Sequence, residues 1–489
     1  MPPSSRAKRV PRGHEPVHPL EIVLLVLTGA ELGFLPWAFG GVDAPGEIAG
    51  AAVAVAALAV ALVPRRSAAR PVDEYSSGLS PFGRLLRFPV FWAGLAGLAY
   101  VGVQALNPAF EYHLDETTWW LSPIDHVRWL PAGMRAPFAE MNPWRAMIVG
   151  GSAWATGCAL WIGITHRRTI LWLLTALAIN AAELTAFGIV QRAGGAPGPY
   201  GVRPAESPFF FASFVYKNHA AAYLGLLGSV ALGLAGDAFR TSRRRHERSS
   251  PAILFFFFAL LAGVGIVLSF SLSGIVLFGA VVLTAAAAAA WQSWRSAART
   301  PVRLSVIVTA SVLLLLAAGL AVVVGSADLR SGVERVVEGK TVASARTRWL
   351  AARRGAEMLA DRWVAGWGAG CFRYGFTKYQ HRDAELTQWR QAWLRWEHVH
   401  DDWLEFLIEL GVIGFLPILA TAAFWLRRIV RLRLWREPLL LPILCGLAAL
   451  ALHACWDFPL QCPAILGTAS ALLPLAVRWG EIGDRTRPV

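Results

Sequence analysis

Residues 252–291 read AILFFFFALLAGVGIVLSFSLSGIVLFGAVVLTAAAAAAW, a stretch without a single charged side chain. A helix needs about 20 mainly apolar residues to cross the hydrocarbon core of a bilayer, which is about 30 Å thick. This stretch therefore has room for two crossings. We divide it into Ala252–Phe270 and Leu272–Trp291, which abut in a tight turn. It predicts an all-α membrane protein whose helices cross the bilayer repeatedly.

Similar apolar runs occur along the rest of the chain. Its 489 residues are 55% hydrophobic and 16% charged, with a mean hydropathy of +0.47, whereas soluble domains carry about 25% charged residues. We therefore predict a polytopic helical bundle with about 12 transmembrane helices. Their expected bounds are Leu20–Gly40, Ile48–Val63, Phe88–Leu106, Ala146–Ile164, Thr169–Val190, His219–Ala235, Ala252–Phe270, Leu272–Trp291, Leu304–Gly325, Trp403–Trp425, Pro438–Trp456 and Pro463–Val477.

The distribution of Lys and Arg predicts the orientation of the bundle. With the N-terminus inside the cell, the inside segments hold 27 of the 46 Lys and Arg residues and the short outside loops hold 6. This contrast follows the positive-inside rule, and it explains the net charge of +14 without a nucleic-acid partner. We expect nine helices in 20–325, a large outside loop in 326–402, three helices in 403–477, and cytoplasmic tails at 1–19 and 478–489.

The long loop holds the other 13 Lys and Arg residues, against 10 Asp and Glu. Guanidinium groups bind phosphate through a planar fork of donors, so one interpretation is a site for an anionic headgroup such as a lipid pyrophosphate. The other is a solvated helix face with i,i+4 ion pairs, such as Arg353 with Glu357. Strong helix formers at 345–361 predict a small folded lid. The clustered arginines are Arg346, Arg348, Arg353, Arg354 and Arg362.

Two shorter outside segments also carry candidate residues. Residues 107–145 are rich in tryptophan, and residues 191–218 carry Arg203 and Lys217. These two cations either contact an anionic headgroup or extend along the membrane surface to reach water.

Three glycines alternate in the sequence AGWGAGCF, at Gly366, Gly368 and Gly370. Glycine permits tight turns and close approach of the backbone to a ligand. No strand precedes this run, so it is not a dinucleotide-binding fingerprint. We favour a structural turn.

The segment WEHVHDDWLEFLIELGVIGF, residues 396–415, concentrates ionisable groups at the outer end of the tenth predicted helix. Histidine abstracts protons near neutral pH, and a neighbouring carboxylate raises its basicity. Ionisable groups at membrane depth usually face a cavity or a partner. We favour a functional cluster over an interfacial cap. Its members are His398, His400, Asp401, Asp402, Glu405 and Glu409.

These blocks together resemble the O-antigen ligase and polymerase family of bacterial envelope glycosyltransferases. The stretch from His398 to Leu404 is similar to the family pattern His-x-His-Asn-Asp-Tyr-Leu, with Asp and Trp in place of the family's Asn and Tyr, and Glu-Leu-Gly follows at Glu409. The glycine run resembles the family's Gly-x-Gly-x-Gly-x-Phe, and either Arg348 or Arg346 matches the arginine before it. A third, less specific block, FVYKNHAAAYL, leads into the sixth helix.

The resemblance implies transfer of a glycan from a polyprenyl (undecaprenyl) diphosphate carrier to an acceptor hydroxyl, such as that of lipid A-core, at the outer face of the inner membrane. His400 would deprotonate the acceptor and Asp402 would orient His400. Arg348, with Arg346 and Arg203 or Lys217, would neutralise the departing diphosphate. The remaining acids, His398 and the glycines would support these groups. Membrane lipid would surround the protein, and the resemblance implies neither a cofactor nor a metal.

Three alternatives stay open at this point. A ligase and a polymerase differ only in their acceptor, and the single large loop favours a ligase. A transporter or lipid flippase would explain the helices but not the Arg, Trp and His of the long loop. Cys455 and Cys462 either form a disulfide or are two free thiols.

Overall fold

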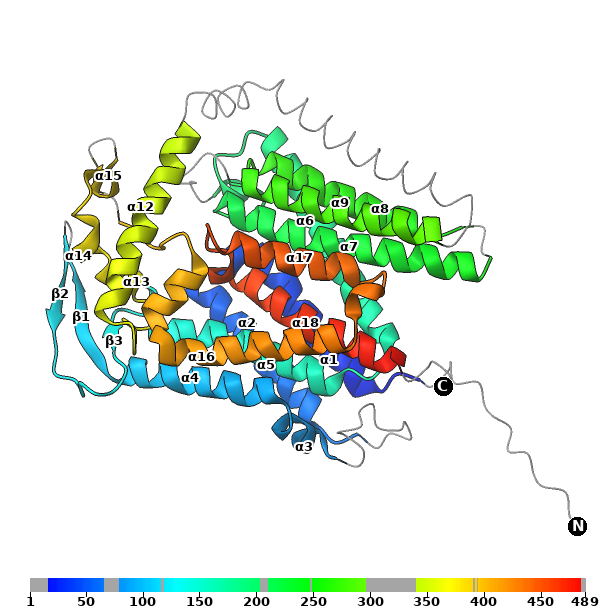
Figure 1. The fold of residues 1–489 in the computed structure, drawn as a ribbon, viewed down its shortest axis with the longest axis horizontal. Coiled ribbons are helices and arrows are strands. Elements are labelled where there is room, and N and C mark those ends of the chain that lie inside the picture. Colours follow the sequence, from blue (N-terminus) through cyan, green and yellow to red (C-terminus); the bar gives the residue numbers. More distant parts are fainter. Residues whose placement is uncertain are drawn as a thin grey trace, which may run out of the picture.

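The computed structural model shown in Figure 1 describes residues 16–65, 79–115, 118–202, 210–246, 249–295, 340–389, 392–393 and 395–484. Long apolar helices make up most of these residues, because in lipid only a helix satisfies all of its backbone hydrogen-bonding groups within one segment. They are α1 (Pro19–Trp37), α2 (Ala44–Leu62), α4 (Pro89–Leu106), α5 (Pro143–Gly163), α6 (Arg167–Ala193), α7 (Lys217–Arg244), α8 (Ala252–Leu268), α9 (Leu272–Arg295), α16 (Asp402–Arg431), α17 (Leu440–His453) and α18 (Pro463–Asp484).

These helices coincide with the predicted spans that fall on described residues. Eight of them are long and apolar enough to cross a membrane, namely all except α8, α17 and α18. Helices α8 and α17 are apolar but shorter. The predicted ninth span, Leu304–Gly325, lies outside the described residues, so the count of twelve remains a prediction. A helical membrane bundle is confirmed.

The long helices run side by side in Figure 1, and buried polar pairs join several of them. Arg145 at the start of α5 donates to both carboxylate oxygens of Glu47 on α2, at 2.7 and 2.8 Å. Glu31 on α1 accepts hydrogen bonds from Ser152 and Thr156 of α5. Such contacts satisfy ionisable groups that would be costly if they faced lipid alone.

A second layer lies across one end of the bundle (Figure 1), opposite the end where α1 begins and α18 ends. Its longest element is α12, which confirms the helix expected at 345–361. The layer comprises α12 (Lys340–Asp361), α13 (Phe372–Gly375), α14 (Thr377–Gln380), α15 (Ala384–Thr387), β4 (Gln388–Trp389) and β5 (Ala392–Trp393). It also holds a small sheet in the order β2-β1-β3, made of β1 (Pro108–Leu114), β2 (Trp119–Pro123) and β3 (Gly133–Arg135).

The small sheet is a departure from the all-α prediction. Strands β1 and β2 form an antiparallel hairpin, and β1 pairs with β3 in parallel. One face of the hairpin packs on the layer of α12 to α14 through Tyr112, whose ring lies 4.9 Å from that of Tyr374. Aromatic residues favour strands when one face is buried against other elements, and only the tertiary fold supplies that face.

Five shorter elements complete the described chain, and four of them are the helical turn α3 (Pro81–Leu86) and the 3-10 turns η1 (Phe39–Gly41), η2 (Pro199–Gly201) and η3 (Leu434–Arg436). A fifth, η4 (Pro459–Gln461), connects α17 to α18 and lies next to the candidate site.

Candidate functional site

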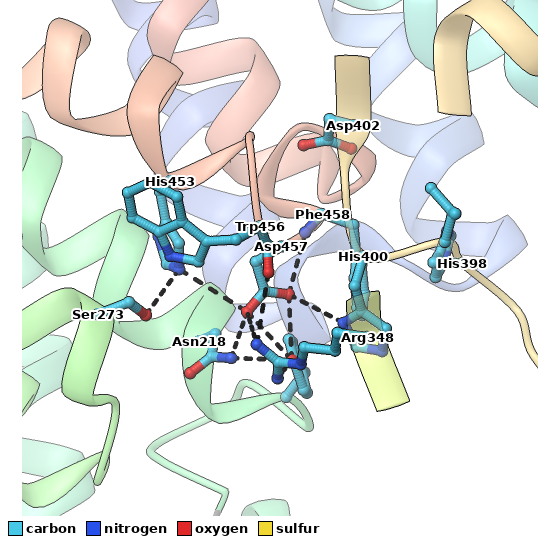
Figure 2. Close-up of polar contacts among 12 residues, drawn as sticks. Asn218, Ser273, Arg348, His398, His400, Asp402, His453, Trp456, Asp457 and Phe458 are labelled. Carbon is cyan, nitrogen blue, oxygen red and sulfur yellow. Dashed lines mark hydrogen bonds and ion pairs between the residues drawn. The ribbon is translucent and has the colours of Figure 1, made fainter. Parts of the chain in front are cut away.

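Asp457, in the loop between α17 and η4, is the centre of a buried polar cluster (Figure 2). Its side chain is only 1% exposed. The hydroxyl of Tyr216 donates to it at 3.1 Å, and the amide of Asn218 also donates to it. Three basic groups surround the same carboxylate: His400 Nδ1 at 3.5 Å, Arg348 Nη1 at 3.7 Å and His453 Nε2 at 3.8 Å.

Four separate segments deliver these side chains. Tyr216 caps the start of α7, Arg348 lies on α12, His400 immediately precedes α16, and His453 ends α17. A cluster assembled from four separate elements is held by the fold as a whole. This is the usual way in which reactive groups are kept in a fixed mutual geometry.

The ring of Phe458 fixes the aromatic members of the site. It stacks on Tyr216 with centroids 4.8 Å apart, and on His398 at 4.3 Å. The ring of His400 meets it edge-on at 4.9 Å. The dipeptide of Asp457 and Phe458 therefore supplies both the charge and the packing platform of the cluster.

The backbone at His400 is in the left-handed region, with φ at 61°. For a residue with a Cβ this conformation costs about 1–3 kcal/mol, and it persists only where surrounding contacts enforce it. Here the next residues begin α16, where the Asp401 side chain caps the helix by accepting from Leu404 N at 3.0 Å. The amide of Asp402 donates to the carbonyls of Ala454 and Asp457. These bonds tie the His400 loop to the Asp457 loop.

Burial and charge set the protonation of the two central groups. Burial lowers the pKa of His400, and the nearby Asp457 carboxylate opposes this only in part. Burial alone would raise the pKa of Asp457, but His400, His453 and Arg348 outweigh it and hold that pKa well below its usual range. Near neutral pH the pair is therefore a neutral imidazole beside a carboxylate. Nδ1 faces the carboxylate, so Nε2 is the ring nitrogen on the opposite side.

Arg348 is held loosely. Its Nη atoms lie 3.4 Å from the Trp456 carbonyl and 3.4 Å from the Tyr216 hydroxyl, and its side chain is 30% exposed. Good hydrogen bonds from nitrogen are 2.7–3.2 Å long. The guanidinium thus keeps donor capacity for an anionic ligand while remaining at the edge of the cluster.

The other arginines of the predicted cluster do not join Arg348. Arg346 is 67% exposed and pairs with Glu385 at 2.8 Å. Arg354 bonds to Asp383 and Glu357, so the expected pairing of Glu357 with Arg353 is wrong by one residue. A helix turns about 100° per residue, so these positions on α12 point in different directions. Of the described arginines on α12, only Arg348 reaches Asp457.

Asp402 does not orient His400. Its Oδ2 accepts from Leu460 N at 2.8 Å, and Figure 2 draws no contact between Asp402 and the ring of His400. The nearest carboxylate to that ring within the described chain is Asp457. The reason is helical direction: Asp402 already belongs to the first turn of α16 and points toward η4.

Glu405 and Glu409 have supporting contacts. Glu405 lies 2.7 Å from His398 Nδ1 and accepts from Val399 N at 2.8 Å. Burial lowers the pKa of His398 to about 3, so this ring is neutral. Glu409 accepts from Phe372 N at 3.0 Å. These groups position the His400 loop and the segment that follows the glycine run.

The glycine run packs against a break in α16 at Gly411, where φ is 62°. The amides of Trp367 and Gly368 donate to the carbonyls of Ile408 and Glu409. Gly366, Gly368 and Gly370 all have positive φ, and a Cβ on Gly366 would lie 2.2 Å from the Glu409 carbonyl oxygen. The run therefore serves backbone-to-backbone packing, as the favoured interpretation of a structural turn predicted.

The remaining sequence candidates lie elsewhere. Lys217 donates to the carbonyl of Phe270 at 3.2 Å. Arg203 lies outside the described residues. Cys455 and Cys462 are free thiols, of which Cys462 is buried and donates to the carbonyl of Gly40. No disulfide joins them in this structure.

Asp457, His453, Tyr216 and Phe458 were missed by sequence reasoning. The available signal was WDF at residues 456–458, because a charged residue in a short loop between two apolar helices needs a partner. A sequence alone does not show that this loop faces His400.

The fold and the site define a polytopic membrane protein with a buried His–Asp pair and an arginine at one end of its helices. Comparison with known protein families matches residues 256–419 to the family described as O-Antigen ligase. Residues 256–419, about a third of the chain, are thus similar to the O-antigen ligase family, as the motifs indicated. The match spans Arg348, the glycine run and His400, whereas Asp457 lies beyond it. A search among curated proteins found no match.

This family consists of membrane glycosyltransferases of the ligase and polymerase type, and the match supports an enzymatic activity in general. A bacterial multi-pass membrane location follows from the same match and from the apolar helices.

Proposed function

We propose that the protein transfers a glycan from a polyprenyl diphosphate carrier to an acceptor hydroxyl, with His400 as the general base and Arg348 as the group that receives the diphosphate. The observation that carries the proposal is the convergence of His400, Asp457 and Arg348 in one buried cluster. This is the arrangement that proton abstraction and departure of an anionic group require side by side.

The step balances as a displacement at the anomeric carbon. The acceptor oxygen gives its proton to His400 Nε2 and bonds to the anomeric carbon. The bond from that carbon to the diphosphate oxygen breaks, and its electron pair leaves with the polyprenyl diphosphate. Asp457 stabilises the imidazolium that forms, as the carboxylate does in other histidine-based sites. Arg348 turns its free donors to the diphosphate, where charge stabilisation supplies much of the rate.

Asp457 takes the role that the sequence had given to Asp402. Arg348 is favoured over Arg346 because it alone of the two contacts the cluster. Lys217 and Arg203 are not needed for this step, although Lys217 begins α7 next to Tyr216.

His400→Ala tests the proposal. The variant should insert into the membrane normally and lose transfer almost completely, whereas near-normal transfer would remove His400 from the mechanism. The readout is a gel of surface glycolipids from a strain that lacks the chromosomal copy and carries either wild type or the variant.

The same gel separates ligase from polymerase. Bare lipid core with long glycan left on the carrier indicates a ligase acting in a bacterial inner membrane. Core with a single repeat unit indicates a polymerase. We favour the ligase because of the single large loop before α16. An unchanged pattern would contradict both and would favour a transporter or flippase.

A further inference from the structure

A cavity of about 1190 Å³ lies between the β1–β2 hairpin and the segment from the end of α12 to α14. It shares no residue with the Asp457 cluster. Arg348 and Asp361 both lie on α12, thirteen residues apart, which corresponds to about 20 Å along a helix. The helix that carries the arginine of the candidate site therefore ends at this cavity.

Aromatic side chains form much of the cavity wall. Phe110 and Trp119 come from the hairpin, and Trp367 and Tyr374 come from the opposite side. The apolar C–H face of a sugar ring packs well on such rings, while its hydroxyls need polar neighbours. Thr118, Thr377 and Gln380 line the same cavity and supply them. A lipid tail would offer these polar groups no hydrogen bonds.

Two arginines are set into the aromatic walls. The guanidinium of Arg362 lies 4.4 Å from the Trp367 ring and 5.7 Å from that of Phe110. That of Arg395 lies within 6 Å of the rings of Tyr112, Trp119 and Tyr374.

These cations are poorly neutralised. Within the described part of the chain, no carboxylate lies within 4.0 Å of Arg362, and burial lowers its pKa. Arg395 meets Glu140 at 3.3 Å, but its buried Nε has no hydrogen-bond partner among the described residues. Lys378 adds a third cation to the lining and lies 3.9 Å from Asp361, the one carboxylate among the described lining residues. An anionic group is the natural complement of this wall.

We propose that the cavity binds acidic sugar units of the glycan, with the rings of Phe110 and Trp119 stacking on sugar faces and Arg362 and Arg395 binding a carboxylate or phosphate on them. The inference rests on the proposed function for the source of the glycan, either the donor chain or the acceptor. The volume of the cavity exceeds the roughly 300–1,000 Å³ of common small-ligand pockets, which suits several linked sugars.

Binding to the purified full-length protein in detergent tests this directly, with tetragalacturonic acid and its carboxyl-reduced neutral counterpart as probes. Wild type should bind the acidic probe at least tenfold more tightly than the neutral one. Arg362→Gln should remove most of that difference, and Trp119→Leu should weaken both probes. The matched control is Arg135→Gln, since Arg135 is on the same sheet, is 61% exposed and does not line the cavity. It should bind as wild type does.

Equal binding of both probes by wild type, or unchanged binding in Arg362→Gln and Trp119→Leu, would overturn the inference. His400→Ala should bind both probes normally. The binding result can therefore be interpreted even if the transfer proposal fails. In transfer assays, Arg362→Gln should raise KM for the lipid-linked donor if the donor glycan occupies the cavity, or for the acceptor if the acceptor does. An unchanged KM for both substrates would contradict the proposal.

Discussion

His400 Nδ1 lies 3.5 Å from Asp457 Oδ1, although the whole of α16 and α17 separates the two residues along the chain. The pair exists because the loop before α16 and the loop after α17 meet at the same end of the bundle. The Asp402 amide, which donates to the Asp457 carbonyl, joins the two loops directly.

Asp457→Asn should reduce glycan transfer by about 10²- to 10⁴-fold, because an amide neither stabilises an imidazolium nor fixes the ring proton on Nδ1. Initial transfer rates with purified protein measure this. Asp383→Asn is the control, since Asp383 pairs with Arg354 and not with the cluster. Wild-type rates in Asp457→Asn would exclude the pair from the mechanism.

The pH dependence of transfer should report the lowered pKa of His400. A histidine titrates ordinarily near pH 6.5, so in wild type the rate should stay level through pH 6.5 and fall only at lower pH, where His400 becomes protonated. Asp457 raises this pKa, whereas Arg348 and His398 lower it. Asp457→Asn should therefore move the acid limb of the pH–rate profile to still lower pH and also reduce the overall rate. An acid limb above pH 6.5 in wild type would contradict the assignment.

The variants Arg348→Gln and Arg346→Gln should differ sharply in their rates of glycan transfer. Loss of Arg348 removes the guanidinium beside Asp457 and should lower transfer by about 10²-fold or more. Loss of Arg346 removes an exposed pair with Glu385, and such pairs contribute about 0–1 kcal/mol. The transfer rate of Arg348→Lys should fall between the rates of these two variants, because lysine keeps the positive charge but lacks the planar fork of guanidinium donors. Equal effects of the two Gln variants would mean that the diphosphate lies elsewhere along α12.

Gly366→Ala should destabilise the protein by more than the roughly 1–3 kcal/mol that a positive φ costs a residue with a Cβ. The added methyl would lie 2.2 Å from the Glu409 carbonyl oxygen and 2.5 Å from Gly411 N. Gly195→Ala isolates the backbone cost, since Gly195 also has positive φ, at 65°, with open space around it. Thermal unfolding in detergent compares the two. Equal midpoints would show that the close packing of the glycine run against α16 is unimportant.

Several features were predictable because they depend on local sequence. Apolar runs long enough for a bilayer gave the helices, helix formers gave α12, and the spacing of His398, His400 and the glycine run indicated the family. The motif residues did include His400 and Arg348, which the structure brings to one cluster.

The amino-acid sequence by itself thus determined that this is a helical membrane protein and which motifs it carries, because lipid requires apolar helices and motifs are read along the chain. Only the tertiary structure decided that Asp457, not Asp402, faces His400, and that Arg348 reaches the cluster while Arg346 points away. It also decided that PAFEYHL and WWLSP pair as strands. Each of these outcomes depends on the direction of a side chain or on a partner distant in sequence, and both are set by how the helices pack.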